Sequence, residues 1–146
     1  MISSYKNEDL SILKWVQTLF SDAPFIKVID AFPKANLTIP TISVDCIQTT
    51  GEYIELGSRE FLKTRIYSID VFAKDRNTRD EYLYRILDAL ENSIPIYDYN
   101  VSFETPELIN YFDVKEFKLR NLEPLPEAEV LYYRGNVYLG VQLIRR

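Results

Sequence analysis

The stretch from Leu62 to Ile94, LKTRIYSIDVFAKDRNTRDEYLYRILDALENSI, combines a strand pattern with a helix pattern and decides the fold class. Over 62–74, apolar residues alternate along one face and also occur on the opposite face, which predicts a central strand covered on both sides. Over 79–91, apolar residues recur at helical spacing, and Thr78 with Glu81 has the form of a capping box. This helix connects strands at both ends, so we expect it to pack on the sheet.

The patterns on either side of this stretch extend the prediction. An amphipathic helix is expected over 8–20, with Asn7 as its N-cap and with Glu8 and Asp9 complementing the helix dipole. Alternating or β-rich segments predict further strands over 25–29, 38–47, 94–99, 112–122, 129–133 and 137–144.

Two connecting segments complete the expected architecture. Arg134-Gly135-Asn136 predicts the tight turn of a C-terminal hairpin. Residues 49–61, TTGEYIELGSREF, contain two of the four glycines and are expected to form a mobile loop or a protruding hairpin arm. The sequence therefore predicts a single α+β domain over residues 1–146. We expect a mainly antiparallel sheet, two amphipathic helices packed on it and a C-terminal β-hairpin.

Composition excludes several classes of protein. The 146 residues include 17 basic and 22 acidic side chains, and a net charge of −5 argues against a protein that grips nucleic acid phosphates. Histidine is absent and Cys46 is the only cysteine, so Cys/His zinc sites, Ser-His-Asp triads and internal disulfides are impossible. We expect Cys46 to be a small buried hydrophobe. With neither a signal peptide pattern nor a long apolar run, a soluble cytosolic protein is expected.

Carboxylates are the only plentiful catalytic candidates, and their spacing is unspecific. Asp70 is expected on a strand, paired with Lys63, Arg65 or Arg76. Asp75 with Asp80, or Glu52 with Glu55, could form a magnesium or glycosidase pair, but helix capping and a solvated loop explain them better. The glycines match no phosphate-binding motif. We therefore expect no catalytic residue, no metal site and no cofactor, and we expect that the protein is not an enzyme.

Tyrosine is the most abundant aromatic residue, with 11 copies. Six of them could stack on nucleic acid bases: Tyr97, Tyr99, Tyr111, Tyr132, Tyr133 and Tyr138. Because the segment around 97–111 is acidic, and because tyrosine favours protein–protein contacts, an interface is the better interpretation. The profile is that of an assembly subunit.

The order of these patterns resembles the tail terminator (tail completion) proteins of long-tailed bacteriophages, of the lambda type. The shared layout begins with the helix over 8–20 and continues through motifs that span most of the chain. They are IPTISV (39–44), TGEYIELGS (50–58), RIYSIDVFA (65–73), RDEYLYRILDALENSI (79–94), IYDYN (96–100) and VYLGVQLIRR (137–146). The stretch 100–127 is longer and richer in proline than this family's pattern.

The resemblance implies a structural virion protein at the neck of the phage. Such proteins form a ring, usually of six subunits, that stops tail-tube polymerisation and joins the tail to the head connector. The implied partners are other copies of the chain, the tail-tube protein and the head–tail connector or stopper protein. DNA would be only passing cargo in the lumen, no membrane would be involved, and host cytoplasm would be the place of assembly.

The resemblance also suggests where the tail tube would be contacted. The candidates lie in the expected arm: Glu52, Tyr53, Ile54, Glu55, Arg59 and Glu60. An ordinary solvated loop is the equal alternative for this segment. Three other functions stay open: a related neck connector or stopper, a non-viral α+β protein-binding adaptor, and an enzyme that uses carboxylates and a metal.

Overall fold

The computed structural model describes residues 2–30, 38–53, 61–122 and 133–145. Its first helix, α1 (Ser4–Leu19), begins earlier than expected because the Ser3 hydroxyl accepts a hydrogen bond from the Lys6 backbone N–H at 3.2 Å. The predicted cap at Asn7 is therefore wrong, and Asn7 lies buried inside the helix. On the apolar side of α1, Ile12 and Val16 are fully buried and Leu13 and Leu19 are partly buried.

The second helix, α2 (Arg76–Ala89), also begins one turn earlier than predicted. Its N-cap is Asp75, whose carboxylate accepts from the Thr78 backbone N–H at 2.7 Å. The expected capping box of Thr78 and Glu81 is wrong, because Thr78 is already helical. The apolar stripe that predicted the helix is confirmed, since Tyr82, Leu83 and Ile86 are buried.

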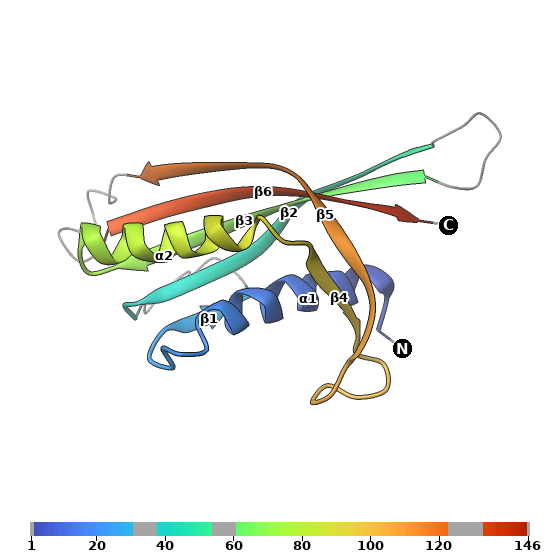
Figure 1. Ribbon diagram of the computed structural model, residues 1–146, viewed down its shortest axis with the longest axis horizontal. Helices are drawn as coiled ribbons and strands as arrows, with labels where there is room; N and C mark the ends of the chain where they lie inside the picture. Colours follow the sequence, from blue (N-terminus) through green and yellow to red (C-terminus); the bar gives the residue numbers. More distant parts are fainter. Residues whose placement is uncertain (1, 31–37, 54–60, 123–132, 146) are drawn as a thin grey trace.

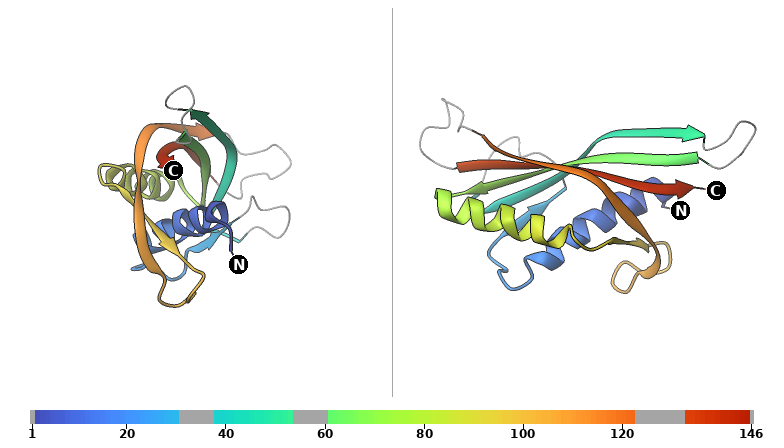
Figure 2. Two further views of the ribbon diagram at one scale, coloured as in Figure 1. Left: turned by 90° about the vertical axis from the view of Figure 1, so that its right-hand side faces the viewer. Right: turned by 45° about the horizontal axis from the view of Figure 1, so that its top comes forward.

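Six strands form one curled sheet against which both helices pack (Figures 1 and 2). They are β1 (Lys27–Ile29), β2 (Thr41–Tyr53), β3 (Phe61–Ala73), β4 (Ile94–Asp98), β5 (Glu107–Leu122) and β6 (Tyr133–Arg145). Their order is β1-β2-β3-β6-β5-β4, and among the described pairs only β1 with β2 is parallel. The predicted α+β class with a mainly antiparallel sheet is confirmed.

The C-terminal antiparallel pair differs from the expected one. Residues 134–136 do not turn, because they lie within β6 and pair with Asp70, Val71 and Phe72 of β3. The hairpin partner of β6 is β5, which runs antiparallel to it. Gly135 has a packing role: a Cβ added there would lie 2.4 Å from Cδ1 of Leu83 on α2. Gly135 therefore leaves room for the Leu83 side chain of α2 and does not form a turn.

The core lies between the sheet and the helices. It joins α1 and α2 to alternate residues of the central strands, among them Ile69, Val71, Val137 and Leu139, all fully buried. Figure 1 shows both helices on the same side of the sheet, and Figure 2 shows the sheet curling around α1. No helix in the described part of the chain has the length and apolar character needed to cross a membrane.

Helix α1 also closes one edge of the sheet. The Tyr97 backbone N–H donates to the Ser11 hydroxyl at 2.8 Å, and the Tyr99 N–H donates to the Asn7 side-chain oxygen at 3.1 Å. These donors belong to β4 and the residue after it, at the end of the strand order. Because the helix satisfies them, this edge is a poor template for another strand.

Candidate interaction surface

Only part of the predicted arm lies within the described residues. Strands β2 and β3 pair as far as Tyr53 and Phe61, and their paired ends extend beyond α1 in Figure 1. Glu52 is exposed near the end of β2 and pairs in register with Leu62. The remaining candidates, Ile54, Glu55, Arg59 and Glu60, fall outside the described residues. The tube-contact role of this segment stays a prediction.

A buried ion cluster holds the root of this hairpin to α1. The Lys63 ammonium lies 2.5 Å from a Glu8 carboxylate oxygen, and both side chains are almost fully buried. Arg65, two residues further along β3, lies 2.8 Å from Asp9 and 3.5 Å from Glu8. It also donates to the Tyr5 carbonyl at 3.0 Å. The start of α1 is thereby fixed on β3 by Glu8 and Asp9, which were expected only to complement the helix dipole.

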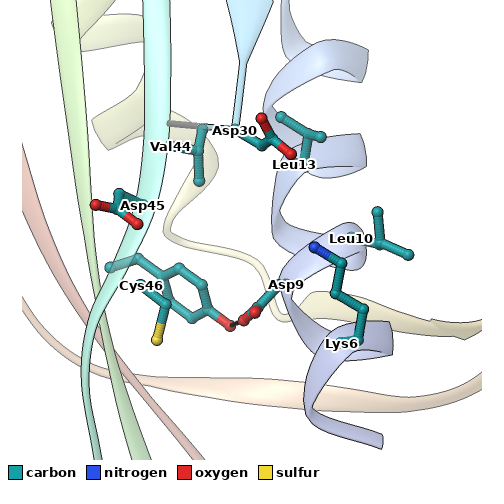
Figure 3. A pocket seen from close by; sticks show the side chains of 9 residues that line it. Lys6, Asp9, Leu10, Leu13, Asp30, Val44, Asp45 and Cys46 are labelled. Carbon is teal, nitrogen blue, oxygen red and sulfur yellow. Dashed lines mark hydrogen bonds between the residues drawn. The ribbon is translucent and has the colours of Figure 1, made fainter. Parts of the chain in front are cut away.

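Beside this cluster, α1 and β2 enclose a cavity of about 210 Å³ (Figure 3). Lys6 and Asp9 reach toward it from α1, while Cys46 lies on β2. Asp9 accepts a hydrogen bond from the Tyr67 hydroxyl at 2.7 Å, and burial raises the pKa of Tyr67 above its ordinary value. Tyr67 is therefore a neutral donor, and Asp9 is already engaged by it.

The cavity offers little chemistry. Cys46 is half-buried, and its Sγ lies 3.2 Å from an Arg65 guanidinium nitrogen, so it is in a more polar setting than the expected buried hydrophobe. In the described ranges, no three His, Cys, Asp or Glu side chains gather so that they could hold a metal ion. In this region Glu8 and Asp9 of α1 bind side chains of β3 and so hold the helix on the sheet.

Asp70 has partners other than those expected. Its carboxylate lies 3.1 Å from the Arg134 guanidinium and 3.2 Å from the Asn136 side-chain nitrogen, both on β6. The expected Lys63 and Arg65 lie an odd number of residues away, hence on the opposite face of β3. The alternation of side chains along the strand could have excluded Lys63 and Arg65 as partners of Asp70 from the sequence alone. The pairing of β3 with β6, which supplies the actual partners, could not be predicted from the sequence.

Five of the exposed large apolar side chains lie within or directly after the turn between β4 and β5. We call this group the β4–β5 turn patch; it consists of Val101 (87% exposed), Phe103 (63%), Leu108 (47%), Ile109 (54%) and Tyr111 (50%). Figure 1 shows this turn projecting from the body below β5. Apolar groups clustered in this way at a projecting turn are typical of protein–protein contact sites.

Local hydrogen bonds give the turn a defined shape. Asp98 accepts from the Asn100 backbone N–H at 2.9 Å, and this bond lowers the pKa of Asp98. The Thr105 N–H donates to the Ser102 hydroxyl at 3.1 Å. Phe103 packs against the buried Tyr99 with 5.5 Å between ring centroids. The exposed rings and methyl groups are thus presented on an ordered support.

The sequence indicated part of this surface. Of the tyrosines expected at an interface, Tyr111 is exposed in the patch and Tyr133 is exposed on β6. Tyr97 and Tyr138 are half-buried, Tyr99 is buried, and Tyr132 lies outside the described residues. Val101 and Phe103 were missed, although two large apolar residues in a polar turn segment are a usable signal. Leu108 and Ile109 were missed because β5 begins five residues before the predicted strand.

Comparison with known proteins gives similarity to solved structures but not to any known sequence family. No family model and no curated protein matches the chain. Among solved structures, the chain is similar to a chain from the virion of a native gene transfer agent (GTA) particle. The sequence identity is 14%, the match covers 89% of this chain and 84% of that chain, and the TM-score is 0.45.

Proposed function

We propose that this protein is a structural subunit of a phage virion that forms a ring at the head-proximal end of the tail. The ring ends tail-tube polymerisation and joins the tail to the head connector. The observation that carries the proposal is the β4–β5 turn patch, because exposed apolar side chains on a projecting turn and the adjoining start of β5 are typical of protein–protein contact sites. One further point supports it, which is that the order of sequence motifs resembles that of tail terminators.

The assembly state tests this proposal. Light scattering of the purified protein at high concentration should give a species of about six times 17.2 kDa. Negative-stain images of the same sample should show rings with a central hole. A monomer at every concentration, or open filaments without closed rings, would contradict the proposed ring.

The arm provides a separate test of the tube-facing side. Deleting 52–58 should leave the fold intact, because the buried ion cluster at Lys63 and Arg65 lies nearer the body of the sheet. The same deletion should abolish capping of tail tubes, measured as tubes of uncontrolled length in electron micrographs. Tubes of normal length in this variant would refute the arm as the tube contact and leave the ring untouched.

A further inference from the structure

A second apolar feature lies away from the turn patch, where the start of α2 meets the segments around β1. There a cavity of about 290 Å³ is lined by Phe25, Ile39, Pro40, Lys74, Thr78 and Tyr82. Phe25 is 68% exposed, so its ring forms an open apolar wall, and Tyr82 is buried. Lys74 is exposed, and among the described residues of the lining it is the charged one. The cavity suits an apolar group that carries a negative charge beside it.

The β4–β5 turn has this chemistry. Phe103 is 63% exposed, and the next residue, Glu104, is exposed and acidic. An apolar cavity of about 150 Å³ is known to hold benzene, so the space around Phe25 can take one phenyl ring with room for neighbouring atoms. Glu104 would then lie at the rim, where Lys74 supplies the opposite charge.

The two features lie far apart on one molecule. In Figure 1 the turn between β4 and β5 is at the lower right, while the start of α2 is at the far left; the second view in Figure 2 shows the same separation. A turn held by its own hydrogen bonds cannot reach across the body to its own cavity. If a β4–β5 turn fills this cavity, it must therefore belong to a second copy of the chain.

We propose that the β4–β5 turn of one copy inserts Phe103 into the cavity beside Phe25 of the next copy, with Glu104 facing Lys74. This inference rests on the proposed function, because it names the contact between ring subunits. Such a contact joins two different patches, so an open row of copies keeps one free turn at one end and one free cavity at the other until the ring closes.

Charge exchange tests the contact. Glu104→Lys and Lys74→Glu should each weaken assembly, raising the concentration for half-assembly about tenfold or more, because each places like charges together. Mixing the two variants should restore assembly, since each turn then meets a cavity of opposite charge. The double variant should assemble alone. Glu91→Lys, which changes an exposed acid at the end of α2, is the matched control and should assemble like wild type.

Apolar substitution tests the other half of the contact. Phe103→Ser should lower assembly while leaving the thermal unfolding midpoint close to that of wild type. Tyr84→Ser, at a residue that is 54% exposed on α2, should change neither. Mass measured by light scattering is the readout for all variants, and thermal melts exclude unfolding as the cause.

The outcomes separate this inference from the proposed function. If Glu104→Lys and Lys74→Glu both form closed rings as readily as wild type, the proposed contact is wrong and the proposed ring function is unaffected. Filaments that respond to charge exchange and its rescue would support the contact and contradict the terminator role. A wild-type protein that stays monomeric would overturn both.

Discussion

The pair of Glu8 and Lys63 shows how one residue can serve a purpose that its local sequence does not reveal. Glu8 follows the expected pattern of an acid near a helix start, yet it lies buried and faces an ammonium 55 positions away in the chain. Burying two charges costs solvation free energy, which their close contact must repay. The pair therefore fixes where α1 sits on β3 more than it adds stability.

Replacing one residue of the Glu8–Lys63 pair should lower the free energy of unfolding far more than replacing both. We expect Glu8→Gln, which removes the carboxylate charge beside Lys63, to lower the free energy of unfolding by about 3–5 kcal/mol. The double variant Glu8→Leu with Lys63→Met should recover most of that loss, because apolar side chains of similar size can replace a buried pair. Urea unfolding measures both. A double variant as unstable as the single one would contradict this account.

Gly135 makes a second prediction at this scale. Gly135→Ala should lower the free energy of unfolding by about 1–3 kcal/mol, since its Cβ would press on Leu83, which is fully buried and cannot move aside. Gly140→Ala is the matched control on the same strand. Its Cβ would meet the Glu116 side chain, which is exposed and can shift, so the loss should be smaller. Equal losses in thermal melts would argue against the packing role of Gly135.

At the scale of elements, periodicity predicted the cores of both helices and most strands, while their ends were decided by contacts that periodicity does not contain. Helix α2 begins at Arg76 because Asp75 caps it, one turn before the more obvious Thr78. Strand β6 runs straight through a turn signal because β3 pairs with it on one side and β5 on the other. Around this turn signal the β3–β6 pairs join residues more than sixty positions apart, and the local sequence cannot specify them.

The cap of α2 predicts a pH dependence. The Thr78 backbone N–H donates to the Asp75 carboxylate and lowers its pKa below the ordinary value. Because the folded pKa is the lower one, the stabilisation is complete above the unfolded value, near 3.9, and is lost as pH falls through the folded value. Asp75→Asn keeps a capping side chain without the charge. Wild type should therefore lose stability relative to Asp75→Asn on acidification from pH 5 to about pH 2, followed by urea unfolding. An unchanged difference across this range would contradict the assignment.

At the scale of the whole molecule, the sheet curls around its helices, and α1 closes the β4 edge with Ser11 and Asn7. Exposed apolar groups lie instead at the β4–β5 turn and beside Phe25. Residue patterns predicted an assembly subunit from tyrosine content and the missing catalytic motifs. They could not place these two surfaces, since each combines residues from separate parts of the chain or from a segment without periodicity.

Engineered cysteines distinguish a head-to-tail arrangement from a symmetric dimer. In a Cys46→Ser background, which removes the only native thiol, Phe103→Cys combined with Phe25→Cys should form disulfides between copies on mild oxidation. Non-reducing gels should show a ladder of oligomers that stops at the closed ring. Either single cysteine variant alone should stay monomeric on the gel, because a head-to-tail contact does not bring the same residue of two copies together. A dimer band from Phe103→Cys alone would instead show that the turn meets itself across a two-fold axis, and a contact of that symmetry cannot propagate into a ring.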